Sequence, residues 1–404
     1  MSIDAKHRSF LICLLICCTC SIASGQETDV VLPGALPTIE AARFPSIQAA
    51  LDAVPEGGAL VRLPAGTFKI NEPLRIETGD TSVVGTGTST HIVNENTQGR
   101  PAILIADPRC QDARRDRQHQ LWRVRLADLR ITGNEASGAG IEARQTNEVF
   151  LHGVSVSENG GDGVLLDFCY EDPRVADCLF TYNRRTGLNL VGCHDIVVSA
   201  CQFEENDDAL HCVDGFNLCM SGCCLDDHLG DGVVIENTYG SVVAGNMIEE
   251  CKGTAIVLDR DCYGIALSAN VIAHNGGGID LRDAHGCAVS ANTFTIMKSN
   301  ALRIGPNSGR IAVSGNSFSD SYIGNGSVRR QENDRIAAGI VLHATDDVAI
   351  SGNVFSGLTE KAVSLVERSR RILFSNNLLR DVDSDHDLLS ESTAANNHVS
   401  GADE

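Results

Sequence analysis

The chain has 404 residues, with 53 Asp and Glu against 32 Lys and Arg, and a formal net charge of -21. This acidity argues against a nucleic-acid partner, because phosphate recognition needs a basic surface. The 39 Gly, 16 Cys and 4% aromatic residues fit neither a collagen nor a small disulfide scaffold. The length is typical of two or three domains, unless one core grows by stacking repeats.

The first 25 residues are typical of a secretory signal peptide. A short basic start at Lys6 to Arg8 precedes an apolar run from Phe10 to Ala23, and the small residues Ser24 and Gly25 follow. The run is shorter than the ~20 residues that span a bilayer. We therefore expect a signal peptide at 1–25, a mature domain at 26–404 that is secreted, periplasmic or at the cell surface, and no stable membrane insertion.

A repeat of 23 residues dominates the chain from its first third onward. Each unit reads as three short alternating strands separated by polar turns, and Val and Ile replace the leucine pattern of leucine-rich repeats. Such a period predicts stacked coils that share one continuous core. Each unit begins with a small residue followed by an aliphatic one, at Gly140, Gly163, Gly187, Ala209, Gly232, Ala255, Gly278, Ala301, Gly339 and Ala362.

Residues at the bend after the second strand of each unit predict inward-facing ladders. A side-chain amide at this bend can hydrogen-bond the next coil. In the middle coils the bend carries Cys178, Cys201 and Cys223, and Cys169 and Cys193 share another column. We interpret these thiols as structural and leave any disulfide pairing open. The predicted asparagine ladder is Asn134, Asn246, Asn270, Asn292, Asn316, Asn353 and Asn376.

The repeat and its entry segment resemble the right-handed parallel β-helix proteins of the pectate-lyase-like superfamily over nearly all of the mature chain. The segment from Phe44 to Leu51, followed by Gly57 and Gly58 and the string LPAGTFKI, is similar to the N-terminal cap and first coil of that group. The resemblance implies an all-β solenoid of about 10 to 12 coils with an N-terminal capping helix. Its parts would be a capping segment at 26–58, regular coils at 140–390 and a polar tail at 391–404.

The fold serves lyases, hydrolases, epimerases and binding proteins, so the activity depends on residues that face outward. One group of these is Asp208, Asp231 and His211, on neighbouring coils about 4.8 Å apart. Paired carboxylates suit the acid and nucleophile of glycoside hydrolysis. The strings DDAL and GDGV resemble the GDDC and GHG stretches of polygalacturonase-like hydrolases, with Asp231 in place of the histidine.

A second group, Asp259, Asp280, Arg282 and Arg303, alternates in charge over consecutive coils. A uronate lyase needs a base for the C5 proton and a cation that neutralises the substrate carboxylate, and this group supplies both residue types. Glu236, Asp259 and Asp280 are candidate ligands for Ca²⁺. The alternative is that these columns of charge only solvate the surface.

Two arginine-rich loops interrupt the repeat, one between Asp107 and Arg125 and one before Gly339. Such loops can border a binding face. The scarcity of aromatic residues leaves few stacking platforms for neutral sugars and favours an anionic polysaccharide as partner. The expected substrate-binding residues are Arg114, Arg115, Arg117, Trp122, Arg144, Arg329 and Arg330.

The sequence therefore predicts an exported carbohydrate-active β-helix protein that acts on acidic polysaccharide by β-elimination or glycoside hydrolysis. Two alternatives remain open from the residues alone. One is a non-catalytic β-helix protein of the cell surface or one that binds polysaccharide, and the other is a uronate C5-epimerase. All three would use the same outward-facing strands.

Overall fold

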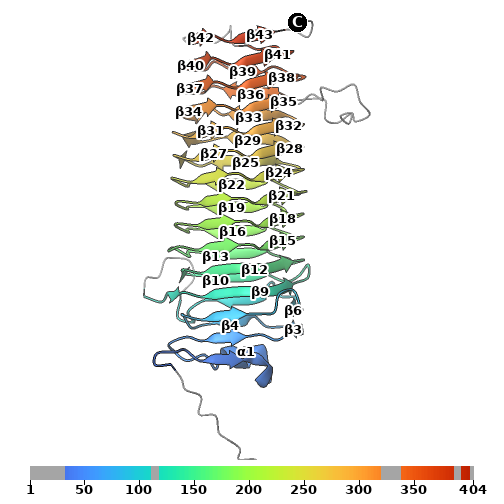
Figure 1. Cartoon of the computed structure of the whole chain (residues 1–404), viewed down its shortest axis with the longest axis vertical. Coiled ribbons are helices and arrows are strands. Elements are labelled where there is room, and N and C mark those ends of the chain that lie inside the picture. Colours follow the sequence, from blue (N-terminus) through green and yellow to red (C-terminus); the bar gives the residue numbers. More distant parts are fainter. Residues whose placement is uncertain (1–31, 111–117, 320–337, 386–392, 401–404) are drawn as a thin grey trace, which may run out of the picture. The chain divides into compact units, whose positions relative to one another are not determined.

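The computed structural model describes residues 32–110, 118–319, 338–385 and 393–400. Residues from Leu36 onward form one compact unit, and this unit is a stack of β-coils (Figure 1). The predicted signal peptide lies outside the described residues, as do five of the predicted substrate-binding residues, namely Arg114, Arg115, Arg117, Arg329 and Arg330. Among the helices that are described, none is long and apolar enough to cross a membrane.

Each regular coil contributes one strand to a 12-stranded parallel sheet, called here the first-strand face. Its middle strands alternate buried and half-buried residues, because successive side chains of a strand point to opposite sides of the sheet. From β10 onward a small residue lies just before the strand or at its second position because the coils are close there: a Cβ on Gly163 would lie 2.5 Å from the Gly187 carbonyl oxygen. In stacking order the strands are β4 (Leu74–Ile76), β7 (Ile103–Ile105), β10 (Ile141–Arg144), β13 (Val164–Asp167), β16 (Leu188–Val191), β19 (Leu210–Val213), β22 (Val233–Glu236), β25 (Thr254–Asp259), β29 (Gly277–Leu281), β33 (Asn300–Ile304), β36 (Ala338–His343) and β39 (Val363–Glu367).

The second and third strands of the coils pair into a 29-stranded sheet that bends around the core. The second strands are β1 (Thr38–Glu40), β2 (Leu60–Arg62), β5 (Ser82–Val84), β9 (Arg125–Thr132), β12 (Phe150–Ser157), β14 (Arg174–Ala176), β17 (Val197–Ser199), β20 (Cys219–Ser221), β23 (Val242–Ala244), β27 (Ala266–Ser268), β31 (Ala288–Ser290), β34 (Gly309–Ser314), β37 (Asp346–Ser351), β40 (Arg370–Ser375) and β42 (Thr393–Ala395). In two coils, β9 and β12 continue through the third position. The separate third strands are β3 (Gly66–Ile70), β6 (Thr90–Asn94), β15 (Leu179–Thr181), β18 (Gln202–Glu204), β21 (Cys224–Asp226), β24 (Met247–Glu249), β28 (Val271–Ala273), β32 (Thr293–Thr295), β35 (Ser317–Ser319), β38 (Val354–Ser356), β41 (Leu378–Arg380) and β43 (His398–Ser400).

Short strands also form in the turn between the first and second strands, called here the first turn. They are β8 (Leu121–Trp122), β11 (Thr146–Asn147), β26 (Cys262–Tyr263) and β30 (Ala284–His285). The three-strand coil predicted from the repeat is therefore confirmed, and the polypeptide returns to each column after one turn of the stack.

The ends of the stack differ from the regular coils. A 3₁₀ turn, η1 (Ala41–Arg43), and one short helix, α1 (Ile47–Leu51), lie at the N-terminal end, where the Ser46 side chain accepts a hydrogen bond from the Ala49 amide at 3.1 Å. Ile47, Ala50 and Leu51 are buried against the core, so this segment caps the N-terminal end as expected.

The stack has about 14 turns, more than the 10 to 12 predicted. The difference arises because the first coils do not keep the 23-residue spacing, so the period does not reveal them. At the other end β42 and β43 pair with β40 and β41, so coils continue past residue 390, within the segment predicted to be a polar tail.

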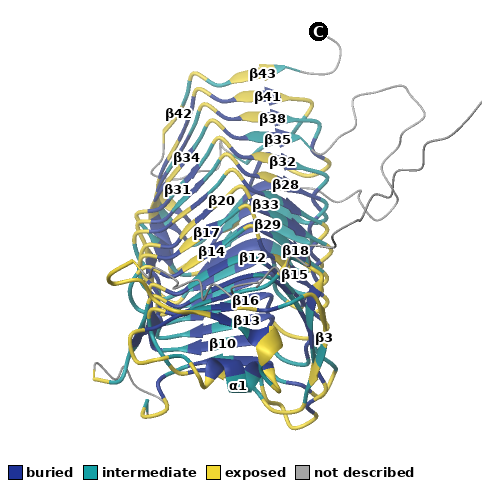
Figure 2. Ribbon diagram, turned by 60° about the horizontal axis from the view of Figure 1, so that its bottom comes forward, coloured by how far each residue is buried: buried dark blue, intermediate teal, exposed yellow. Residues whose placement is uncertain are grey.

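The interior is one continuous apolar core (Figure 2). Phe294, Phe318 and Phe355 stack at the coil spacing, with ring centroids 4.8 Å apart and planes within 4° of parallel. All three are fully buried. Burial of such side chains contributes roughly 1.5–3 kcal/mol each, so the core is the main source of stability.

The predicted asparagine ladder is present, with two corrections. Asn377, not Asn376, occupies the buried position, where its Oδ1 accepts from the Asn353 amide at 3.0 Å, whereas Asn376 is exposed. Asn134 is not a member, because it follows the third-strand part of β9 and donates to the carbonyls of Asn94 and Asn96. Its predicted place was wrong because the early coils are out of phase with the regular repeat.

A second ladder, which the sequence did not suggest, follows the third strand. Asn183 Oδ1 accepts from Asn159 Nδ2 at 2.9 Å, and Asn206 Oδ1 accepts from Asn183 Nδ2 at 2.8 Å. The predicted thiol column of Cys178, Cys201 and Cys223 lies at the same bend as the first ladder and is buried. Each cysteine in the described part of the chain is a free thiol.

Candidate functional site

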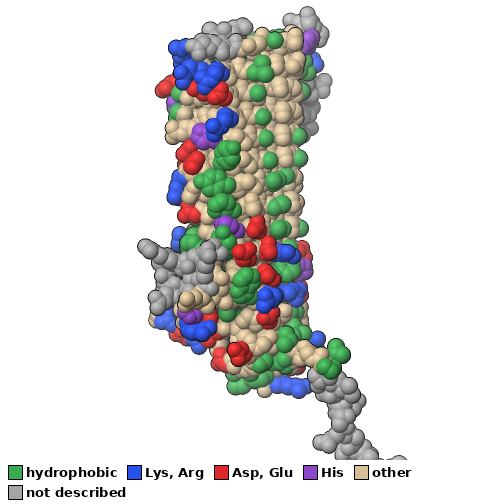
Figure 3. All heavy atoms as spheres, turned by 90° about the vertical axis from the view of Figure 1, so that its left-hand side faces the viewer, with side chains coloured by type: hydrophobic (Ala, Val, Ile, Leu, Met, Phe, Trp, Pro, Cys, Tyr) green, Lys and Arg blue, Asp and Glu red, His purple; other side chains and the backbone are tan. Residues whose placement is uncertain are grey.

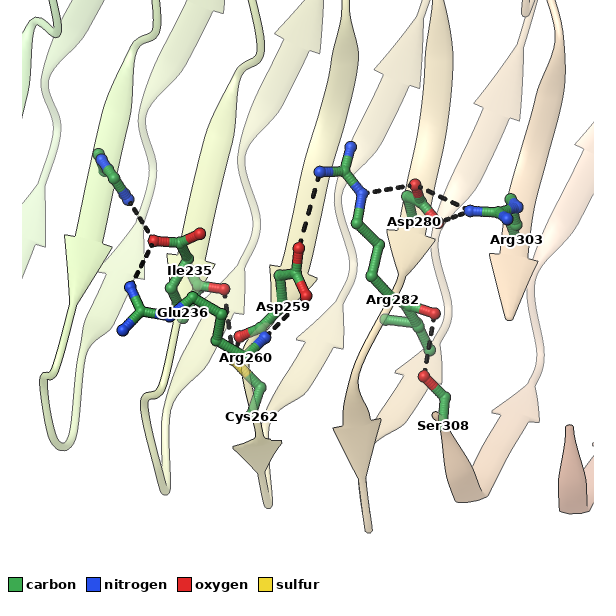
Figure 4. Close-up of polar contacts among 11 residues, drawn as sticks. Ile235, Glu236, Asp259, Arg260, Cys262, Asp280, Arg282, Arg303 and Ser308 are labelled. Carbon is green, nitrogen blue, oxygen red and sulfur yellow. Dashed lines mark hydrogen bonds and ion pairs between the residues drawn. The ribbon is translucent and has the colours of Figure 1, made fainter. Parts of the chain in front are cut away.

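A chain of polar contacts runs along the first-strand face from β19 to β39, and Figure 4 shows its part between Glu236 and Arg303. Asp280 on β29 is nearly buried, with 14% of its side chain exposed. Its carboxylate accepts from Arg282 Nε at 2.9 Å and from Arg303 Nη1 at 3.2 Å. The second predicted group is therefore brought together, with the carboxylate of Asp280 clamped between two guanidinium groups.

The chain continues in both directions from this clamp. Arg282 also lies 3.8 Å from Asp259, and Arg303 Nη2 donates to His343 Nδ1 at 3.2 Å. Burial lowers the pKa of Arg282, but the hydrogen bond to Asp280 and the charges of Asp280, Asp231 and Asp259 together raise it. Asp231 of the first predicted group thus interacts electrostatically with the second group.

His211 forms the other end of the chain. Its Nε2 lies 3.3 Å from Glu236 Oε2, and the same oxygen accepts from Arg260 Nη1 at 3.2 Å. The side chain of His211 is 28% exposed, so its ring is reachable from solvent. A carboxylate on one ring nitrogen fixes the proton there and leaves the other nitrogen, Nδ1, as the proton acceptor.

Asp208 and Asp231 stand just before β19 and β22 and point along the stack. Asp208 Oδ1 accepts from the Asp231 amide at 2.7 Å, and Asp231 Oδ1 accepts from the Thr254 amide at 2.6 Å. Burial raises the pKa of Asp208, the Asp231 amide opposes this, and the charges of Asp231 and Asp207 raise the pKa further. Each carboxylate thus has one oxygen engaged in holding the next coil.

The counter-charge beside Glu236, Asp259 and Asp280 is in each case an arginine. Ca²⁺ at these carboxylates stays a prediction. The described groups whose possible metal-ligating atoms lie within 4.8 Å of one another are elsewhere, at the ends of third strands. They are Glu249, Glu250 and His274, and Asp226, Asp227 and Glu250.

The described members of the predicted substrate-binding set lie in the first coils. Arg144 ends β10, is paired with Glu142, and lines a cleft of about 190 Å³ together with Arg75 and Asp107. Trp122 is half-buried in β8 and pairs in register with Asn147. The first-turn position of Trp122 places it in the loop that was expected to border the face.

Sequence reasoning missed Arg260, the cation nearest to the pair of His211 and Glu236. The residue follows Asp259 in the first turn and has a φ of 57°. This left-handed conformation is uncommon for a residue with a side chain, and no strand periodicity marks it. The guanidinium contacts the preceding coil at Glu236 and lies 3.9 Å from Asp214.

Comparisons with known proteins agree with this architecture. The family model described as "Right handed beta helix region" matches residues 117–217 and 139–294. No curated protein matches the sequence.

Solved structures with similar folds share little sequence with the chain. The A-module of the Azotobacter vinelandii mannuronan C-5 epimerase AlgE4 aligns with a TM-score of 0.59 at 18% identity, over 80% of this chain and 93% of that one. The family 28 exopolygalacturonase of Yersinia enterocolitica aligns with a TM-score of 0.51 at 11% identity, over 91% and 77%. Tailspike protein 3 of bacteriophage CBA120 aligns with a TM-score of 0.57 at 12% identity, over 92% and 65%. With its stacked coils and its match to the right-handed β-helix region, the chain is a right-handed parallel β-helix protein.

Proposed function

We propose that the protein cleaves a uronate-containing polysaccharide by β-elimination on the first-strand face, with His211 as the base. The observation that carries this proposal is the pair of His211 and Glu236. Glu236 holds the proton on Nε2, so Nδ1 can take the C5 proton of a uronate and the resulting imidazolium is stabilised by the carboxylate.

Arginine side chains supply the positive charge that this reaction needs. The C5 proton of a uronate becomes acidic enough to remove only when the neighbouring carboxylate is neutralised. Arg260 contacts the same Glu236 oxygen as His211, and 56% of its side chain is exposed. Arg282 and Arg303 follow at successive coils and can bind the carboxylates of the next sugar units.

Asp208 is suited to the acid role in the second half of the reaction. Elimination breaks the bond between C4 and the glycosidic oxygen, which must receive a proton. Asp208 lies just before the strand of His211, and its raised pKa keeps it protonated to a higher pH than an ordinary aspartate. The proton therefore passes from C5 to His211, and a second proton passes from Asp208 to the leaving oxygen.

The same geometry supports hydrolysis less well. An inverting or retaining hydrolase needs two carboxyl groups that face the same glycosidic bond. Asp208 and Asp231 each use one oxygen for the amide of the next coil, while Asp259 and Asp280 are held by arginine. The names of two similar structures, a mannuronan C-5 epimerase and an exopolygalacturonase, refer to uronate polymers, which is the substrate class proposed here.

The test is a comparison of variants on a panel of uronate polymers, with the formation of unsaturated ends as the readout. We expect His211→Ala to lower turnover by at least about 100-fold, since general-base catalysis contributes roughly 10²–10⁴-fold. Arg260→Ala should lower kcat as well as raise KM, because the cation that neutralises the carboxylate is what makes the C5 proton acidic. His274→Ala is a matched control, because His274 is another half-buried histidine that pairs with a carboxylate, Glu250, but lies after a third strand, away from the first-strand face.

Two results would contradict the proposal. Full activity in His211→Ala would show that His211 is not the base. New reducing ends without unsaturation would show hydrolysis instead of elimination. Exchange of the C5 hydrogen with solvent without cleavage would indicate an epimerase that shares the base but retains the glycosidic bond. Export of the mature chain remains a prediction that N-terminal sequencing of the protein from its culture medium would check.

A further inference from the structure

Five ring-bearing side chains in successive first turns form a continuous outer column, called here the aromatic ladder: Tyr170, His194, Phe216, Tyr239 and Tyr263. The last four pair through successive β-bridges, so each ring lies one coil above the previous one. Ring centroids are 3.7 Å apart for the first pair, 4.2 Å for the second and 5.2 Å for the third. Rings that lie 22 to 24 residues apart in the sequence are thus gathered into one line.

The aromatic ladder differs from the ladder of Phe294, Phe318 and Phe355 inside the core. The internal rings are parallel and fully buried, whereas the outer rings are tilted by 32° to 49°. Phe216 is 38% exposed and Tyr263 is 51% exposed. The other three rings are half-buried, so each of the five keeps part of its surface in solvent. Stacking for stability alone would favour full burial of these large rings, so the column is a candidate binding surface.

The aromatic ladder borders the first-strand face. Tyr239 follows Glu236 by three residues, and Tyr263 follows Asp259 by four. In Figure 3 hydrophobic side chains form a band on this side of the stack, beside charged side chains. A polymer that lies over Arg260 and Arg282 therefore has the aromatic ladder along one edge.

A polar cleft continues the line beyond the last ring. His285 pairs in register with Tyr263, and a Cβ on Gly286 would come within 3.3 Å of the Tyr263 ring, so the absence of a side chain there leaves room for this ring. The cleft has a volume of about 550 Å³ and is lined by His285, Arg310 and Arg371, with acidic residues beside them. Arg371 is paired with Asp347, and the charge of Arg310 also acts on Asp347 without a direct contact among the described residues.

We infer that the aromatic ladder and this cleft form a binding track for a uronate polysaccharide that runs parallel to the axis of the stack. The apolar C–H face of a pyranose ring packs on an exposed aromatic ring, and the carboxylate of the polymer pairs with Arg310 at the end of the track. The track shares its polymer with the proposed function but does not depend on the reaction. The track binds sugar units away from the reacting one, and this binding positions the polysaccharide over His211.

The experiment measures binding of the mature protein to a polyuronate and to a neutral glucan by calorimetry and affinity electrophoresis. Tyr263→Ala should weaken polyuronate binding by about 5- to 10-fold. Arg310→Ala should weaken polyuronate binding more than Tyr263→Ala does, and it should leave binding of the neutral glucan less affected than binding of the polyuronate. Tyr182→Ala is the matched control, because Tyr182 is 48% exposed at a bend after a third strand, on another side of the coil. Thermal unfolding of each variant shows whether the fold is intact.

The outcomes separate the track from the reaction. If the wild type binds polyuronate without turnover and Tyr263→Ala weakens that binding, the track stands and the proposed elimination fails. If Tyr263→Ala and Phe216→Leu fold and bind as well as the wild type, the aromatic ladder is only structural and the inference is overturned. Failure of the wild type to bind any uronate polymer would overturn it as well.

Discussion

Replacing Asn292 by Ala should destabilise the stack locally, by an amount that the hydrogen bonds define. Asn292 Oδ1 accepts from the amide and from Nδ2 of Asn270, both at 3.0 Å. Its Nδ2 donates to the Leu267 carbonyl at 2.9 Å and to Asn316 Oδ1 at 3.1 Å. Four bonds of about 1 kcal/mol each give roughly 4 kcal/mol, and the backbone amide of Asn270 is left buried without an acceptor, which alone costs about 1–3 kcal/mol.

Hydrogen exchange resolves this effect coil by coil. Because each coil contacts only its neighbours, the loss of protection should be confined to the coils that flank Asn292. The amide of Asn270 should exchange about 1,000-fold faster, since the loss of roughly 4 kcal/mol is about three factors of ten at 1.4 kcal/mol each. Asn376→Gly is the control, because Asn376 is exposed and has a φ of 56° that glycine tolerates. Unchanged protection of Asn270 in Asn292→Ala would refute the reasoning.

Three further predictions follow from titratable groups. Asp208→Asn should be more stable than the wild type near pH 7. Burial raises the pKa of Asp208 in the folded state, so its ionised carboxylate costs stability near pH 7, and this cost disappears as the pH falls toward the ordinary value of 3.8. Equal melting temperatures of the two proteins at pH 7 would contradict this. Burial lowers the pKa of His228 from 6.5 to about 4 in the folded protein. The free energy of unfolding should therefore fall by up to about 3 kcal/mol as the pH falls from 6.5 to 4. His228→Asn should remove this acid sensitivity in thermal unfolding. Cys219 is exposed and should react with a thiol reagent in the native state. Cys201 should react only on unfolding, because the hydrogen bond with Cys178 and burial raise its pKa to about 12. A fast phase of reaction that persists in Cys219→Ser would contradict the assignment of this phase to Cys219.

The fold was predictable because the coil geometry requires particular residue types at particular positions, and these recur with each repeat. In the regular coils Gly or Ala stands at the start of each first strand, where the next coil comes closest, and this made the 23-residue period visible. The neighbouring pair Asn376 and Asn377 shows the limit of the pattern. The register of β40 and β41 decides which of the two side chains points inward. A shift of one residue in this register would exchange the inward and outward side chains.

The charged columns were also predictable, since alternation along each first strand places Asp280 and Arg303 in register. The arrangement in the turns was not. Arg260 reaches Glu236 through a left-handed backbone conformation. The aromatic ladder combines tyrosine, histidine and phenylalanine at one turn position, so no single residue type repeats there, and the low aromatic content concealed it.

The central claim is that uronate chemistry takes place on the first-strand face, and the most direct measurement is product analysis by NMR. The mature wild-type protein is incubated in deuterated water with polymers of different uronates, and the spectra are followed for unsaturated ends, C5 deuteration and chain length. The account predicts unsaturated ends from at least one uronate polymer and from no neutral polymer. The absence of both cleavage and C5 exchange with every uronate polymer would contradict it.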